Sequence, residues 1–94
     1  MVEENLFKEG ISKEQGELCV QAAQRVVAKV AEQLEMRPRQ VARRFKRGRQ
    51  KDAEVTTAVL THSAAEAVAI DPENLRAILQ VILEFIKALL PLFI

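Results

Sequence analysis

The residues with the clearest chemistry in this chain are eight basic side chains gathered between positions 37 and 51. No acidic residue lies within these fifteen positions, so the segment has a formal charge of +8. All thirteen acidic residues and the other six basic ones lie elsewhere, which leaves a charge of −7 on the rest of the chain. The chain is therefore an acidic body with one cationic stretch, which we call the basic segment. Its cations are Arg37, Arg39, Arg43, Arg44, Lys46, Arg47, Arg49 and Lys51.

The charge of the basic segment indicates an anionic partner. Like charges three and four residues apart on a helix repel each other, and a bound anion would relieve that repulsion. Phosphate is the most common such anion, and arginine, which supplies six of the eight cations, makes bidentate contacts with phosphates and with guanine edges. We therefore predict nucleic-acid binding, to DNA rather than RNA, by these eight residues and Gln40. The alternatives are an acidic protein partner, the acidic body of the same chain and an ordinary solvated face.

Local signals place the basic segment after one long helix and on a second, short one. Ser12 is the expected N-cap of the first helix, with Gln15 at the capping-box position, and apolar residues then recur at steps of three and four as far as Leu34. Pro38 suits the first position of the second helix, and Gly48 suits its end. The apolar side of this second helix is formed by Val41, Ala42 and Phe45, which should dock on the core and leave the cations outward.

Two further helices follow in the same domain. Asp52 is a candidate cap for an alanine-rich third helix, and Asp71-Pro72 marks the start of the fourth. The predicted fold is an all-α, four-helix domain over residues 12–94, with a flexible lead-in over residues 1–11. The four helices are expected at about 13–35, 38–47, 52–69 and 72–90.

Residues 27–46 resemble a bacterial helix-turn-helix, especially that of AraC-type transcription regulators. The stretch 37–45 reads like the recognition helix of that family, and Glu35 occupies the turn position that usually holds glycine. The small residue and the apolar core positions of the pattern are matched by Ala31, Val30, Leu34, Met36 and Val41. The resemblance implies that the segment around 37–46 enters the major groove, with four side chains facing DNA. These are Arg39, Gln40, Arg43 and Arg44.

The C-terminal helix is apolar except for one polar stripe. From Leu75 to Ile94 the interruptions are Arg76, Gln80, Glu84, Lys87 and Pro91. The stripe describes a helix buried on most of its surface. Its charges would cost about 2.5–3.5 kcal/mol each at a membrane centre, so the sum of costs and apolar gains does not clearly favour a span. The surplus apolar face predicts a homodimer interface. Its residues are Ile82, Phe85, Ile86, Leu89, Leu90 and Phe93.

Two other roles remain open for this C-terminal segment. The first is an assembly module, in which the apolar helix binds a partner and the basic segment meets an acidic protein. The second is peripheral membrane binding through the Phe93-Ile94 end together with the basic segment.

The remaining reactive side chains do not form a catalytic pattern. Cys19 is the single cysteine and His62 the single histidine, and no metal-ligand spacing, glycine-rich phosphate loop or nucleophile elbow occurs. We expect Cys19 to be a small buried residue and His62 a structural one. We therefore predict that the protein is not an enzyme and that it has no cofactor, metal site or small-molecule substrate. One cysteine and an acidic N-terminus without an apolar signal stretch predict a cytoplasmic location.

Overall fold

A computed structural model describes residues 12–48 and 50–88, and nearly all of that backbone is helical. The α-helices are α2 (Lys13–Gln33), α3 (Pro38–Arg47), α4 (Ala53–Ile70) and α5 (Leu75–Ala88), and a short 3-10 helix, η1 (Pro72–Asn74), precedes α5. No strand occurs in these two ranges, so the predicted all-α, four-helix class is confirmed. The predicted lead-in over residues 1–11 lies outside the described residues.

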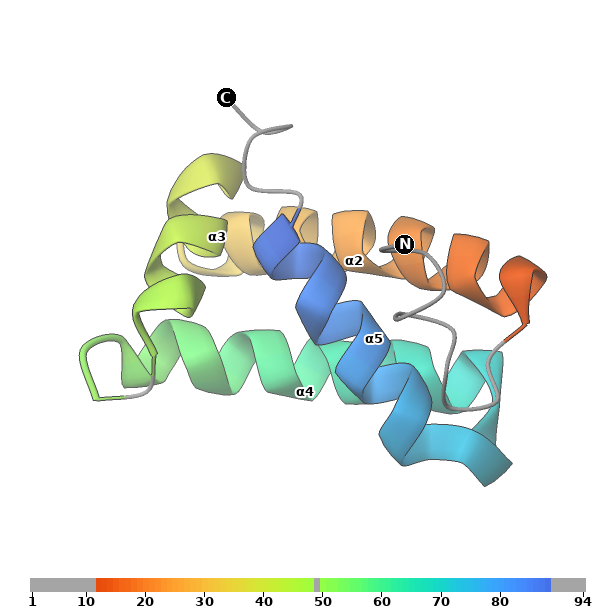
Figure 1. The fold of residues 1–94 in the computed structure, drawn as a ribbon. Coiled ribbons are helices and arrows are strands. Elements are labelled where there is room, and N and C mark those ends of the chain that lie inside the picture. Colours follow the sequence, from red (N-terminus) through yellow and green to blue (C-terminus); the bar gives the residue numbers. More distant parts are fainter. Residues whose placement is uncertain (1–11, 49, 89–94) are drawn as a thin grey trace.

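The long helices α2 and α4 form an antiparallel pair, α5 crosses that pair, and α3 stands at one end of it (Figure 1). Polar contacts mark the antiparallel register from one end to the other. Gln15 meets Asp71 at one end, Arg25 meets Glu66 farther along, and Gln33 meets His62 toward the end where α3 lies. This arrangement places the chain between Leu34 and Asp52, which contains the basic segment, at a single end of the molecule.

The core between the helices is built from small and branched aliphatic side chains. Helix α2 contributes Val26, Val27 and Val30 with several alanines, and α5 contributes Ile78 and Ile82, all completely buried. Full burial of one such aliphatic side chain stabilises the fold by about 1.5–3 kcal/mol. The polar stripe of α5 at residues 76, 80, 84 and 87 is exposed, as the sequence pattern predicts for a core helix. None of the described helices is both long and apolar enough to cross a bilayer.

The helix starts agree only in part with the predicted caps. Ser12 caps α2 as predicted, because its Oγ accepts a hydrogen bond from the Gln15 backbone N–H at 3.1 Å. The reciprocal half of the capping box, in which Gln15 Oε1 would accept from the Ser12 N–H, is not formed among the described residues; Gln15 Nε2 donates to Asp71 Oδ2. Asp71 does cap the next element, with Oδ1 accepting from Glu73 N–H at 3.2 Å, but that element begins as a 3-10 turn. Asp52 precedes α4 without making a side-chain cap bond, so its predicted capping role is also wrong.

Candidate nucleic-acid interface

The turn between α2 and α3 ends the long helix and leads into the basic segment. Glu35 adopts a left-handed backbone with φ of 54°, the only positive φ at a non-glycine residue in the described ranges. The Met36 N–H donates to Ala31 O at 2.9 Å, and the Glu35 N–H donates to Glu32 O at 3.4 Å. This pair of bonds is the Schellman motif, which ends a helix by reversing the local chain direction. Helix α2 therefore ends two residues before the predicted boundary, and Leu34 and Met36 pack on the core from the turn.

The ends of α3 lie at the predicted residues, because proline and glycine set the backbone there. Pro38 occupies the first helical position, and Gly48 ends the helix with φ of 95°. At the N-terminus, the Arg37 backbone N–H donates to Gln40 Oε1 at 3.1 Å. The acceptor oxygen of Gln40 is therefore engaged within the helix, and its side-chain amide nitrogen is the group that remains for a ligand.

Helix α3 is amphipathic, with three core residues on one side and cations on the other. Val41 and Ala42 are completely buried and Phe45 is 7% exposed, so the predicted docking side is confirmed. Six of the predicted cations are exposed, and these are Arg37, Arg39, Arg43, Lys46, Arg47 and Lys51. Gln40 is exposed as well, and Arg49 lies outside the described residues. Arg39 and Arg43 stand one turn apart on the same face of the helix.

Arg44 differs from the other cations because it is half-buried. It lines a cleft of about 410 Å³ with Leu34, Met36 and the first residues of α4. Lys51 adds a second cation to this cleft, but Asp52 and Glu54 add two carboxylates. A lining of mixed charge does not select for an anion, so the exposed side of α3 is the better candidate surface.

Within residues 12–48 and 50–88, Arg47 is the one member of the basic segment that has a carboxylate within 4.0 Å. Its Nη1 lies 4.0 Å from Asp52 Oδ2, a buried oxygen that accepts no hydrogen bond from the described residues. A half-exposed pair at this distance contributes little, since exposed ion pairs are worth about 0–1 kcal/mol. The other described cations of the segment have no carboxylate of residues 12–48 or 50–88 within 4.0 Å, which leaves their charge uncompensated by this part of the chain.

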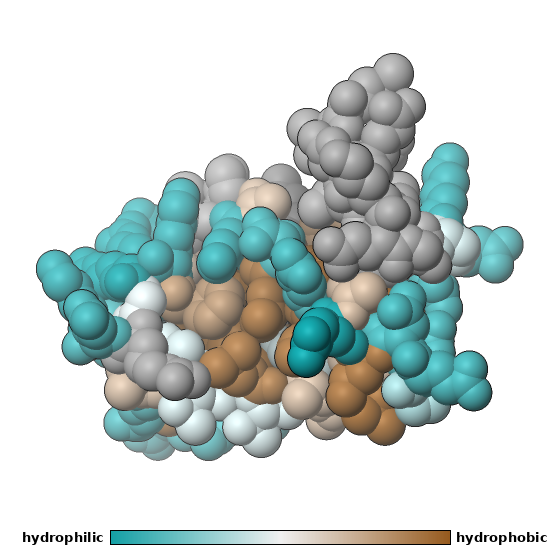
Figure 2. Space-filling model, turned by 60° about the horizontal axis from the view of Figure 1, so that its bottom comes forward, coloured by the Kyte–Doolittle hydropathy of each residue, from teal (hydrophilic) through white to brown (hydrophobic). Residues whose placement is uncertain are grey.

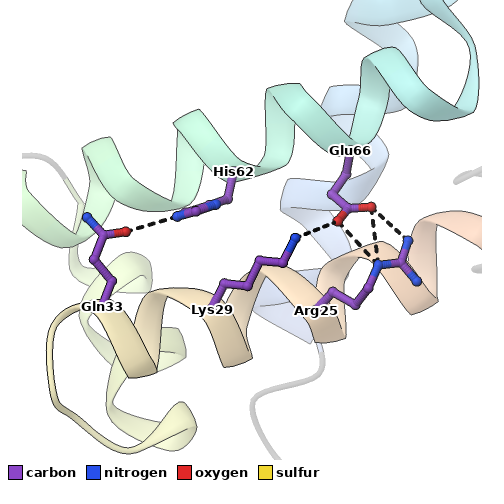
Figure 3. A network of polar contacts seen from close by, with 5 residues as sticks. All are labelled: Arg25, Lys29, Gln33, His62 and Glu66. Atoms are coloured by element: carbon purple, nitrogen blue, oxygen red, sulfur yellow. Dashed lines mark hydrogen bonds and ion pairs between the residues drawn. The ribbon is translucent and has the colours of Figure 1, made fainter.

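Two cations of α2 show the opposite arrangement (Figure 3). Arg25 Nη2 lies 2.7 Å from Glu66 Oε1, and Lys29 Nζ lies 3.7 Å from Glu66 Oε2. The pKa of Glu66 lies below its usual range, chiefly because the hydrogen bond from Arg25 stabilises the carboxylate. Partial burial acts in the opposite direction, and the charges of Arg25 and Lys29 add smaller effects that lower the pKa. These contacts join α2 to α4, so the two cations are engaged in the fold itself.

One cation near the basic segment was not predicted as a site residue. Lys87, in the last turn of α5, places its Nζ 5.7 Å from the centroid of the Phe45 ring. The polar stripe of α5 predicts that Lys87 is exposed, but no sequence pattern indicates that it lies next to α3.

The predicted oligomer interface needs a correction. Ile82 and Ile86 are completely buried in the core of the chain itself, where they have no surface to offer a second copy. Phe85 is half-buried against the same core, and Leu89, Leu90 and Phe93 lie outside the described residues. The apolar side chains gather in the middle of the face in Figure 2, with hydrophilic ones on both sides. The large apolar residues that are exposed on the described surface are Leu18, Val68 and Leu75.

Cys19 and His62 both occupy structural positions. Cys19 is completely buried, and desolvation raises the pKa of its thiol to about 11. His62 Nε2 lies 2.9 Å from Gln33 Oε1, in the same row of contacts between α2 and α4 that contains Glu66 (Figure 3).

Comparison with known proteins identifies no relative from which a role could be transferred. The chain matches no known protein family, no curated protein and no solved structure. The basic segment is therefore interpreted from its own residues and their geometry.

Proposed function

We propose that this chain is a small nucleic-acid-binding domain that contacts duplex DNA through the exposed side of α3 and the residues that flank it. The observation that carries the proposal is the outward presentation of six cations, of which only Arg47 has a carboxylate within 4.0 Å in the described part of the chain. The phosphates of a duplex would supply anionic partners for these cations. Binding would also release counterions that are condensed on the DNA, and this release favours binding.

For the mode of binding, we propose that α3 enters the major groove. Two features support it: the left-handed turn at Glu35 between α2 and α3, and the docking of α3 through Val41, Ala42 and Phe45, which leaves its opposite side open. A groove about 12 Å wide admits a helix presented in this way. Arg39 and Arg43 would reach base edges or phosphates, and Gln40 would offer its amide N–H groups. The half-buried Arg44 would contribute from the edge of the surface.

The proposal extends to where the domain acts. A chain with a single cysteine that is buried needs no oxidising environment, which supports a cytoplasmic location. Self-association stays a prediction, and its residues would have to differ from the buried isoleucines of α5.

A salt titration of binding tests the proposal. Affinity for a 20-base-pair DNA duplex is measured by fluorescence anisotropy between 50 and 300 mM salt, beside an RNA hairpin and anionic vesicles. Wild-type protein should bind duplex with a log–log slope of about −0.9 per phosphate neutralised. The triple variant Arg39→Gln/Arg43→Gln/Lys46→Gln should lose most of the slope and most of the affinity while its helical circular dichroism is unchanged.

The matched control places the same change of charge elsewhere. Lys13, Arg76 and Lys29 are exposed and lie outside the basic segment, and their replacement by glutamine also lowers the formal net charge by three. Because Lys29 pairs with Glu66, the helical circular dichroism of this variant must also match that of wild type. The control variant should bind duplex nearly as tightly as wild type. Equal losses in the two triple variants, or no duplex binding by wild type at 50 mM salt, would show that the proposal is wrong. Binding to RNA or vesicles alone would also exclude it.

A further inference from the structure

We infer that Lys87 of α5 belongs to the same anion-binding surface as α3 and contacts one phosphate of the bound duplex. This inference rests on the proposed function and extends it to a second helix. Its basis is the position of Lys87 Nζ, 5.7 Å from the centroid of the Phe45 ring on α3.

The contact with Phe45 directs the ammonium group toward α3. A cation within about 6 Å of a ring centroid is attracted to the face of the ring, by about 0.5–1 kcal/mol at exposed sites. Phe45 precedes Lys46 on α3, and its ring is held by the core, being only 7% exposed. Lys87 therefore lies against the C-terminal half of α3, beside a ring whose next residue along the chain, Lys46, is an exposed cation.

The ring holds the ammonium group without neutralising it. A lysine ammonium has three N–H donors, and an aromatic face offers them no charged acceptor. No carboxylate of residues 12–48 or 50–88 lies within 4.0 Å of Lys87 Nζ, although Glu84 is exposed one turn earlier on α5. Within the described part of the chain, the charge of Lys87 therefore has no acidic partner, and the same holds for Arg39 and Arg43. Lys29, which engages Glu66, is the contrasting case.

A single substitution with a matched lysine control tests the inference. Lys87→Gln should reduce the magnitude of the log–log salt slope by about 0.9, the value for one phosphate. At 0.1 M salt the same slope corresponds to a loss of up to about eightfold in affinity for duplex, taking 1 M as reference. Lys13→Gln removes an exposed lysine at the far end of α2 and should leave both quantities at the wild-type value.

A second measurement follows the contact with the ring directly. In the NMR spectrum of the wild-type chain, the ε-methylene protons of Lys87 should be shifted upfield by the ring current of Phe45. They should shift again when duplex is added, whereas those of Lys13 should not.

The outcomes separate the inference from the proposed function. If wild type and Lys87→Gln have the same salt slope while the α3 triple variant loses binding, the inference about Lys87 is wrong and the proposed function stands. Equal losses in Lys87→Gln and Lys13→Gln would also overturn the inference, because the effect would then be one of net charge. A wild-type chain that binds no duplex would overturn both.

Discussion

The side chain of Gln15 donates a hydrogen bond from Nε2 to Asp71 Oδ2 at 3.1 Å, which ties the first turn of α2 to the end of α4. The second oxygen of the same carboxylate, Oδ1, accepts from the Glu73 backbone N–H at 3.2 Å. Asp71 therefore serves two elements at once, since one oxygen caps η1 and the other holds α2 in register with α4.

We predict that Asp71→Ala lowers the free energy of unfolding by about 1–2 kcal/mol, because it removes both a cap and a hydrogen bond to a charged group. Gln15→Ala removes only the second and should cost less, and the double variant should be no worse than the sum of the two. Urea titrations with an unchanged m-value measure these differences. Asp71→Asn is the control, because it keeps an oxygen that can accept from Glu73 N–H. An Asp71→Ala variant as stable as wild type would contradict the dual role.

The left-handed turn at Glu35 predicts a substitution that stabilises the fold, whereas Asp71→Ala destabilises it. A side chain in this conformation costs about 1–2 kcal/mol, whereas glycine adopts it freely but loses more entropy on folding. Glu35→Gly should therefore stabilise the chain by about 0.5–1 kcal/mol. The control Glu17→Gly lies at an exposed position inside α2, away from the turn, removes the same charge and should destabilise by about 1 kcal/mol. Thermal melts compare the stability of both variants with that of wild type. A Glu35→Gly variant less stable than wild type would show that the Glu35 backbone carries no strain.

The buried thiol of Cys19 predicts low reactivity and a pH dependence. Because burial raises its pKa from about 9 to about 11, the folded chain should react with iodoacetamide at pH 8 only as fast as it opens. The folded state keeps the thiol proton at pH values where the unfolded chain loses it. Stability should therefore be unaffected by this group below pH 9 and fall as the pH rises from 9 toward 11.

The comparison for this prediction is Cys19→Ala, which should lose less stability than wild type between pH 8 and pH 10. Urea midpoints at the two pH values provide the measurement. Equal losses in the two proteins would place the titrating group elsewhere, and fast alkylation of the folded wild type would contradict the burial of Cys19.

The parts of the fold that the sequence predicts well are those controlled by local backbone chemistry. Helix α3 begins and ends at the predicted residues because Pro38 fixes its own φ and Gly48 takes a positive one. The predicted end of α2 lies two residues too far along the chain, since Leu34 continues the apolar periodicity although it packs from the turn. The predicted start of α5 lies three residues too early, because Asp71-Pro72 opens a 3-10 turn as readily as an α-helix.

Contacts between distant residues could not be predicted in this way. The position of Lys87 over Phe45 depends on the crossing of α5 over the helix pair, and no spacing along the chain encodes that crossing. The burial of Ile82 and Ile86 in the chain's own core could not be predicted for the same reason. An apolar stripe in the sequence is compatible both with a core and with an interface to a partner. The exposure of the basic segment was predictable because the three apolar residues of α3 define its inner side.

Helix α3 has ten residues, and the side chains that hold it are Val41, Ala42 and Phe45. An isolated helix this short has marginal stability in water even without charge repulsion. The helical conformation of α3 therefore depends on its packing against the other helices. Random mutagenesis for loss of nucleic-acid binding should therefore recover substitutions in the interior as well as at the cations. Cooling, or a stabilising osmolyte, should restore nucleic-acid binding to the variants with interior substitutions. The variants with substituted cations should remain unable to bind.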